Sequence, residues 1–360
     1  MAYEVRSESR PNSVGLDGTV YVLLDAAAGT AIEVWPALGF NCYRWQTTYQ
    51  GRSLDLLYAD PQLFDGGRPT RSGIPVLFPF PNRIRDGRYS WNGKDYQLPT
   101  NDPSGKNAIH GFACRKPWRI VDQGADAVSA WLTGEFVGSV DAPEALEHWP
   151  ADYRLRLTWR LTAQTLRIEA VVGNPDSRPL PFGLGYHPYF RIPFTAGVSE
   201  QEYAVECSAR QYWELEDSLP TGQRQPLDEA RDLRTGRLFP SLTLDDVFTD
   251  LAAGSPPAPD ALCWRGGLLQ ADTGITLQVL TSPAFREMVL FTPPHRQAVC
   301  LEPYTCTTDA VNLQQRGLDA GWLVVEPGAA WHGAVELRVA GLQEAPVAAA
   351  RKPLTAAHRE

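Results

Sequence analysis

The stretch Tyr153-Arg-Leu-Arg-Leu-Thr-Trp-Arg-Leu-Thr162 alternates apolar and polar residues without a break. Alternation with a period of two is the pattern of a β-strand that buries one face. After the pair Ala163-Gln164 the alternation resumes, with apolar residues at 166, 168, 170 and 172. Two alternating runs joined by a short turn predict a pair of neighbouring antiparallel strands.

The same kind of pattern recurs on both sides of this pair. Between Arg88 and Leu98, the dipeptide Asn92-Gly93 predicts a tight hairpin turn, because both central positions of that turn require positive φ. The best helical candidate, Pro143–His148, is short, and the strand–helix–strand rhythm of a parallel sheet is missing. Further strand-like runs are Val20–Leu24, Ala31–Trp35, Val128–Thr133, Tyr203–Cys207, Ile275–Leu280 and Val335–Val339. We therefore predict an all-β fold built as a large antiparallel β-sandwich.

No low-complexity linker divides the chain of 360 residues. We expect a single domain over residues 1–343 and a flexible C-terminal tail over residues 344–360, where Ala is frequent and charge is scattered. The Pro- and Ala-rich stretch at 252–259 is expected to be a long surface loop rather than a domain boundary.

Charge and composition exclude several classes of protein. The formal net charge of −9 argues against general nucleic-acid binding, which requires a basic face, and against docking on an acidic membrane surface. The 11 Trp, 13 Tyr and 13 Phe suit a strand-rich core, and some of these rings are suited to stacking on a sugar ring.

Cysteine spacing and the chain start bear on the cellular compartment. The six cysteines are scattered, with no Cys-x-x-Cys pair, so we expect neither a zinc site nor a disulfide framework. Residues 1–15 lack the apolar stretch of a signal peptide, and no apolar run is long enough to span a bilayer. The simplest interpretation is a reducing, cytoplasmic location.

Polar residues gather in loops next to Gly and Pro, where a rigid β scaffold usually carries its functional residues. Asn82 and Arg83 follow an apolar, proline-rich run, and the guanidinium of Arg83 could hold sugar hydroxyls in a fixed fork. The alternative is a structural arginine paired with a loop carboxylate. A lone histidine is more often structural than catalytic, but His110, followed by Gly111, and His187, in Gly185-Tyr-His-Pro-Tyr-Phe190, lie in glycine-flanked loops, which supports a functional role for both.

Two acidic segments complete the set of candidate residues. Glu302 follows the apolar run 298–301, and burial there raises the pKa of a carboxyl toward working pH. A structural Glu paired with a cation explains this segment equally well. Asp245 and Asp246 stand beside an apolar pair, either as hydroxyl ligands or as ordinary turn residues.

Taken together and in order, five segments resemble the aldose 1-epimerase (galactose mutarotase) family. They run from about residue 80 to about residue 303 and are Asn82-Arg83-Ile84, His110-Gly111, Gly185–Phe190, Asp245 with Phe248, and Leu301-Glu302-Pro303. The His-Pro-Tyr-Phe and Glu-Pro pieces are the most specific. The resemblance implies a galactose mutarotase-like supersandwich that interconverts the α and β anomers of a free hexose without a cofactor or a metal.

The resemblance also implies individual roles. Glu302 would be the general base and His187 the general acid, while His110, Arg83 and Asp245 bind and orient the sugar with Asn82 beside them. Asp246 is the alternative to Asp245. The expected partner is a small sugar, with neither nucleic acid nor membrane, and the chain would act as a monomer or homodimer.

One departure leaves the substrate open. His110-Gly111-Phe112 lacks a second glycine that many family members carry, and Cys114-Arg-Lys-Pro-Trp118 is reminiscent of hexose-6-phosphate epimerases. A cationic rim for a phosphate would consist of Arg71, Arg85, Arg88, Arg115 and Lys116, unless these residues form an ordinary solvated surface. A non-catalytic carbohydrate-binding protein and a glycosidase using Glu302 with Asp245 are further alternatives.

Overall fold

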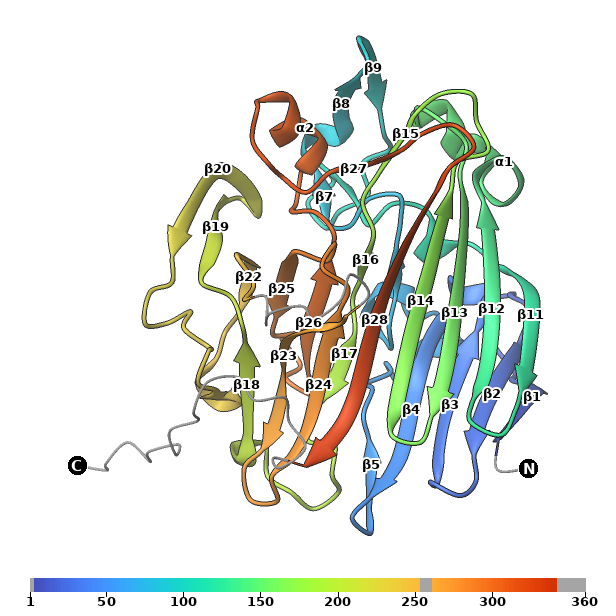
Figure 1. Ribbon diagram of the computed structural model, residues 1–360, viewed down its shortest axis with the longest axis vertical. Helices are drawn as coiled ribbons and strands as arrows, with labels where there is room; N and C mark the ends of the chain where they lie inside the picture. The colour runs from blue at the N-terminus through green and yellow to red at the C-terminus, as the bar shows by residue number, and fades with distance from the viewer. Residues whose placement is uncertain (1–2, 253–260, 342–360) are drawn as a thin grey trace.

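The computed structural model describes residues 3–252 and 261–341, and strands dominate them (Figure 1). The largest sheet has nine antiparallel strands in the order β11 (Arg119–Ala125), β12 (Ala130–Val137), β13 (Arg154–Thr162), β14 (Thr165–Gly173), β28 (Ala330–Gly341), β24 (Ile275–Thr281), β23 (Cys263–Gln270), β18 (Tyr203–Cys207) and β21 (Arg237–Leu238).

A second sheet carries the segments that matter most for function. Its strands are β20 (Leu219–Pro226), β19 (Gln211–Glu216), β22 (Asp245–Thr249), β25 (Glu287–Phe291), β26 (Ala298–Tyr304), β16 (Gly185–Tyr186) and β6 (Val76–Leu77), with β17 (Tyr189–Arg191) also paired to β26. A third sheet consists of β1 (Tyr3–Ser9), β2 (Thr19–Asp25), β3 (Thr30–Trp35), β4 (Asn41–Tyr49) and β5 (Arg52–Asp55).

Three two-stranded ribbons and short helices complete the described fold. The ribbons are β7 (Arg83–Ile84) with β10 (Ala108–Ile109), β8 (Arg88–Trp91) with β9 (Lys94–Gln97), and β15 (Leu180–Phe182) with β27 (Leu323–Val325). The α-helices are α1 (Gly138–Asp141) and α2 (Ala310–Gln315); the 3₁₀ turns are η1 (Pro36–Leu38), η2 (Leu63–Asp65), η3 (Pro69–Arg71), η4 (Arg85–Gly87), η5 (Ala113–Arg115), η6 (Pro143–His148), η7 (Glu200–Glu202) and η8 (Phe239–Ser241).

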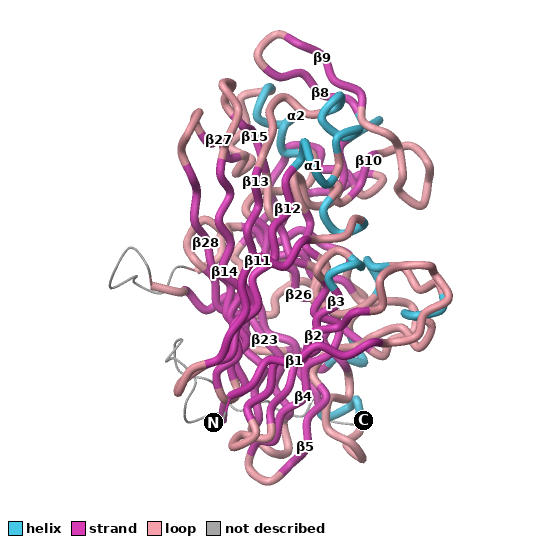
Figure 2. The backbone as a smooth tube through the Cα atoms, turned by 90° about the vertical axis from the view of Figure 1, so that its right-hand side faces the viewer, coloured by secondary structure: helices cyan, strands magenta, loops and turns pink. Residues whose placement is uncertain are grey.

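The predicted all-β sandwich is confirmed, and the alternating stretch 153–162 supplies an interior strand, β13, of its largest sheet. Strands β13 and β14 pair across the turn at Ala163-Gln164, with Trp159 opposite Ile168 and both side chains fully buried. The first two strands of the five-stranded sheet pack against β11, β12 and β13, and Figure 2 shows β2 and β3 on one side of the molecule and β11, β14 and β28 on the other. Apolar faces of these layers meet in one large core.

The other strand predictions hold, with two adjustments. The Asn92-Gly93 turn joins β8 to β9, and both residues have positive φ. The run predicted from Val128 begins as strand only at Ala130, because the Asp126 side chain accepts hydrogen bonds from the backbone of Val128 and Ser129 and holds them in a turn. Pro143–His148 is helical, but as a 3₁₀ turn.

Some expectations fall on residues that the structure does not describe. The loop expected at 252–259 lies, apart from Ala252, outside the described residues, as does the C-terminal segment 344–360. No helix in the described ranges is long and apolar enough to cross a membrane. All six cysteines are free and buried in the structure.

Strands β25 and β26 have one face in the apolar core and one face outside it. Met288, Leu290, Val299 and Leu301 point into the main core. Because side chains alternate along a strand, the intervening residues of β26, Cys300 and Glu302, point to the opposite face. The register of this sheet therefore decides which residues can lie together outside the core.

Candidate functional site

Glu302 and His187 lie next to each other on that opposite face. The distance from His187 Nε2 to Glu302 Oε1 is 3.4 Å, and the two side chains are 8% and 2% exposed. The second oxygen of Glu302, Oε2, accepts a short hydrogen bond from the hydroxyl of Tyr304. The carboxyl thus has one contact to an imidazole and one to a phenol, and no arginine or lysine of the described residues forms an ion pair with it.

The two strands that flank His187 fix its position. Gly185 in β16 pairs with Tyr304, and Tyr189 in β17 pairs with Cys300, so the intervening His187 lies beside Glu302. A side chain at residue 185 would come within 2.4 Å of the Tyr304 ring, which explains the glycine there. The ring of Tyr189 stacks on that of His187 with centroids 4.6 Å apart.

Burial pushes both members of this pair toward their uncharged forms. The pKa of Glu302 is raised well above its usual range by desolvation, which the Tyr304 hydrogen bond and the charge of Arg83 only partly oppose. Desolvation lowers the pKa of His187 to about 3. Both shifts therefore favour placing a proton shared by the pair on the carboxyl rather than on the imidazole.

His110 approaches the pair from a different ribbon. Ile109 pairs with Arg83 between β10 and β7, and the backbone N–H of His110 donates to the carbonyl of Asn82 at 2.9 Å. The ring of His110 meets that of His187 edge-on, with centroids 5.7 Å apart. Burial, followed by the nearby charge of His187, keeps the pKa of His110 well below its usual value.

Both histidines present a buried nitrogen without a hydrogen-bond partner. These atoms are Nδ1 of His110 and Nδ1 of His187. Since buried polar groups are usually paired, unpaired ones mark positions where a ligand or water completes the site. Gly111 makes this placement possible, because a Cβ there would lie 2.2 Å from the carbonyl oxygen of Phe78.

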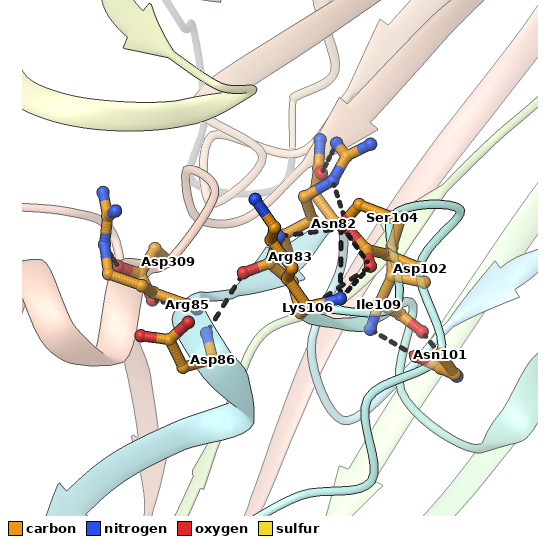
Figure 3. Close-up of polar contacts among 11 residues, drawn as sticks. Asn82, Arg83, Arg85, Asp86, Asn101, Asp102, Ser104, Lys106, Ile109 and Asp309 are labelled. Carbon is orange, nitrogen blue, oxygen red and sulfur yellow. Dashed lines mark hydrogen bonds and ion pairs between the residues drawn. The ribbon is translucent and has the colours of Figure 1, made fainter.

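Arg83 is held in place by two neighbours (Figure 3). Its Nη1 donates to Asn82 Oδ1 at 3.2 Å, and its Nε lies 3.5 Å from Asp102 Oδ2. Although burial alone would raise the pKa of Asp102, hydrogen bonds from Asn107, Ser104 and Lys106 lower it to about 2 and keep the carboxylate charged. Arg83 is thus paired with a loop carboxylate, as one of the two sequence-based alternatives predicted. It also lies near the site, since its charge lowers the pKa values of Glu302 and Asp245.

The register of β22 separates the two adjacent aspartates. Asp245 pairs with Phe291, and Phe291 pairs with Cys300, so Asp245 shares the face of Glu302. Desolvation by the surrounding protein raises the pKa of Asp245, and the charge of Arg83 partly opposes this shift. The residue is nevertheless exposed to solvent. Asp246 points to the other face, where its Oδ1 accepts from Arg231 Nε at 2.7 Å. Both are strand residues, not the turn residues that the sequence also allowed.

Three residues at the site escaped the sequence argument. Tyr304 and Cys300 lie two residues on either side of Glu302 in β26. Because side chains on one face of a strand recur every two residues, this spacing could have placed them beside Glu302 from the sequence. Phe291 reaches His187 from β25, and no local pattern announces that contact. Sequence spacing indicated no clustered metal ligands, yet in the fold the ligand atoms of His187, Cys300 and Glu302 lie within 4.8 Å of one another.

The five residues considered for a cationic rim do not act alike. Lys116 pairs with Glu144, Arg85 lies 3.9 Å from Asp309, and Arg88 donates to Gln97. Arg71 and Arg115 end the neighbouring turns η3 and η5, and neither has a carboxylate within ion-pair distance in the described residues. The rim is thus reduced to two available arginines.

Comparison with known proteins gives a consistent result. A family model described as aldose 1-epimerase matches residues 50–338. The chain is 26% identical over 255 residues to the uncharacterized protein YihR of Escherichia coli K12, covering 70% of this chain and 74% of that protein. It is 28% identical over 159 residues to galactose mutarotase of Mus musculus, a match that spans 42% of each chain.

Two solved structures share the fold. A galactose mutarotase-like protein from Clostridium acetobutylicum superposes with a TM-score of 0.82 at 23% identity, covering 94% of this chain and 99% of that one. A galactose 1-epimerase from Lactobacillus acidophilus does so with a TM-score of 0.73 at 16% identity, with coverage of 94% and 99%.

Proposed function

Because the chain belongs to the aldose 1-epimerase family, we propose that it interconverts the α and β anomers of a free hexose such as glucose or galactose. The observation that carries the proposal is the buried contact of 3.4 Å between His187 Nε2 and Glu302 Oε1. A carboxyl and an imidazole at that distance can exchange protons with two oxygens of one sugar ring.

The chemistry follows from what anomer exchange requires. Glu302 as carboxylate takes the proton of the C1 hydroxyl, the C1–O5 bond breaks, and protonated His187 gives its proton to O5. The open-chain aldehyde then rotates about C1–C2 and recloses by the same transfers in reverse. The protein returns to its starting protonation state, so the cycle requires no redox partner or cofactor.

The single proton of the resting pair fits this cycle. Moving that proton from Glu302 to His187 creates both the base and the acid without any exchange with solvent. The charge of Arg83 favours the carboxylate form, and the hydroxyls of a bound sugar add hydrogen bonds to it. We infer that substrate binding triggers this internal transfer and so activates the pair.

The remaining candidates would hold the sugar. Arg83, fixed by Asn82 and Asp102, offers free guanidinium donors, whereas Asp245 offers acceptors on the same face. The unpaired Nδ1 of His110 supplies one more polar contact. Six buried free thiols agree with action in the reducing cytoplasm. We also propose that the chain acts as a monomer or homodimer.

Polarimetry on freshly dissolved α-glucose and α-galactose tests the proposal directly. The protein should accelerate the approach to equilibrium, and Glu302→Gln should lower that rate by about 10²–10⁴-fold, the usual contribution of a general base, while circular dichroism stays unchanged. Binding of sugar without acceleration would instead support a carbohydrate-binding protein, and release of nitrophenol from a nitrophenyl glycoside would support a glycosidase.

A phosphorylated hexose is the second candidate substrate. It is favoured by Arg71 and Arg115, which lack carboxylate partners in the described residues and whose charges act on Tyr189 and His110 at the site. Comparing glucose with glucose 6-phosphate separates the two possibilities. If the phosphate is recognised there, Arg115→Ala should reduce the rate on glucose 6-phosphate and leave the rate on glucose unchanged.

A further inference from the structure

A cavity of about 350 Å³ lies away from the residues proposed for catalysis, where strands of both large sheets approach each other. The residues that matter for its chemistry are Gln211, Arg224, Thr249, Asp250, Arg265 and Arg286. The complete lining contains three arginines and one aspartate, and one of the arginines, Arg286, is paired with the carboxylate of Asp319, which leaves one surplus positive charge. None of the residues assigned above to sugar binding or proton transfer belongs to it.

Arg265 is the unusual member of this lining. The residue is only 3% exposed, and its Nε donates to Thr281 Oγ1 at 3.0 Å. Its terminal guanidinium nitrogens have no hydrogen bond, and no carboxylate lies within 4.0 Å of it, in the part of the chain that the structure describes. Burial of a charge without a counterion is costly, and here it lowers the pKa of Arg265. An anion in the cavity would offset that cost.

The other two arginines are fixed in advance. Arg286 makes two bonds to the carboxylate of Asp319, at 2.8 and 2.7 Å. Arg224 stacks on the ring of Trp213 at 4.4 Å and donates to the carbonyl of Asp319. Guanidinium groups held in this way lose little conformational entropy when they bind a ligand. Both terminal nitrogens of Arg286 are already bonded to Asp319, so the groups left to bind an oxyanion are the planar forks of Arg265 and Arg224.

We propose that this cavity binds a small phosphate monoester. Arg265 and Arg224, which have no carboxylate partner in the described residues, supply positive charge for the phosphate, and the cavity volume, near the lower end for metabolite pockets, admits a carbon skeleton beside it. Gln211 and Thr249 supply polar contacts for hydroxyl groups of that skeleton. The site is separate from the proposed anomer exchange and does not depend on it.

Titration calorimetry of the full chain at low salt tests this site with glycerol 3-phosphate and inorganic phosphate. Neither probe has a sugar ring, so neither mimics the proposed substrate. We expect one glycerol 3-phosphate per chain and no heat with glycerol. Arg265→Met should weaken binding at least about tenfold, as expected for the loss of a charge-assisted hydrogen-bonding group.

A second pair of variants covers the case in which Arg265→Met does not fold. Gln211→Glu places a negative charge in the cavity at a partly exposed position and should weaken binding to a similar degree. The matched control is Gln123→Glu, on the exposed strand β11 at the far edge of the nine-stranded sheet, and it should leave binding unchanged. Absence of binding to the unaltered chain, or equal effects of the two Gln→Glu changes, would overturn the proposal.

Discussion

Tyr304 donates its phenolic hydrogen to Oε2 of Glu302, two residues earlier on the same face of β26. This bond leaves Oε1 free to meet His187 and orients the carboxyl in a fully buried setting. Because it stabilises the charged form, it opposes the desolvation that raises the pKa of Glu302. Tyr304 therefore serves as a positioning residue for the proposed base.

Removing this hydroxyl with Tyr304→Phe should lower kcat by about 10- to 100-fold, since a hydrogen bond to a charged group contributes about 1.5–3 kcal/mol. The pKa of Glu302 should rise further, so the alkaline limb of the pH profile should move to higher pH. Tyr89→Phe, which removes a buried hydroxyl bonded to the carbonyl of His148, is the control and should leave kcat and the profile unchanged. An unshifted alkaline limb in Tyr304→Phe would contradict this role.

The pH dependence of kcat/KM follows from the directions of the two pKa shifts. His187 gains its proton only as the pH falls toward about 3, and Glu302 loses its proton only above its raised pKa. The one-proton pair, which is the active form, therefore persists between those limits. Stopped-flow polarimetry from pH 5 to 7.5 should show no alkaline limb near 6.5, the usual pKa of histidine, because the proton of the pair lies on Glu302 rather than on His187. A limb at that pH would show that His187 titrates normally.

We expect Glu302 to destabilise the fold, and this destabilisation should increase with pH. Its folded pKa lies above the unfolded value, so below pH 4.5 both states are protonated and no penalty arises. As the pH rises through that value, the unfolded state ionises first and is favoured. Glu302→Gln removes the penalty and should raise Tm by a few degrees at pH 8 but by less at pH 4.5. Equal Tm changes at both pH values, measured by calorimetry, would rule out this linkage.

Arg83 should act mainly in substrate binding. Replacement by Lys keeps the charge but loses the planar fork, so KM should increase about tenfold while kcat changes less. Asp102→Asn, which weakens the support of Arg83, should shift KM in the same direction by a smaller factor. The control is Arg88→Lys, whose arginine contacts Gln97 in the hairpin. A change in kcat with constant KM would place Arg83 in the chemical step instead.

The neighbouring aspartates offer a matched pair of substitutions. Asp245→Asn changes a carboxylate on the face of Glu302 and should raise KM for the sugar severalfold. Asp246→Asn breaks a contact with Arg231 on the other face and should leave both kinetic constants unchanged. Initial-rate measurements on both variants decide the assignment, which is reversed if only Asp246→Asn impairs the enzyme.

Local pattern predicted much of this fold. The strict alternation of β13 and β14, and the Asn-Gly turn between β8 and β9, specify both strands and their pairing, because the partners are adjacent in sequence. The pairing of β14 with β28 joins residues more than 150 positions apart, and no local signal names such a partner. Strand β12 begins at Ala130 rather than at the predicted Val128, because the Asp126 side chain accepts hydrogen bonds from the backbone of Val128 and Ser129.

The same distinction applies to the candidate site. The motifs carrying His110, His187 and Glu302 identified residues that do lie together, as the contacts between their side chains show. Only the register of β22 shows that Asp245 rather than Asp246 shares the face of Glu302. Only the pairing of Phe291 with Cys300 shows that Phe291 lies at the site. The uncharged resting state of the pair depends on burial from all sides, which a linear sequence does not reveal.

The alternation along β26 has a consequence for how this protein tolerates change. Val299 and Leu301 point into the main core, whereas Cys300, Glu302 and Tyr304 point to the face that carries the candidate site. In a residue-by-residue scan of this strand, substitutions at Val299 and Leu301 should chiefly lower Tm, whereas substitutions at Glu302 and Tyr304 should chiefly lower kcat. Neighbouring positions of a single strand therefore differ in whether a substitution acts mainly on stability or mainly on the proposed reaction.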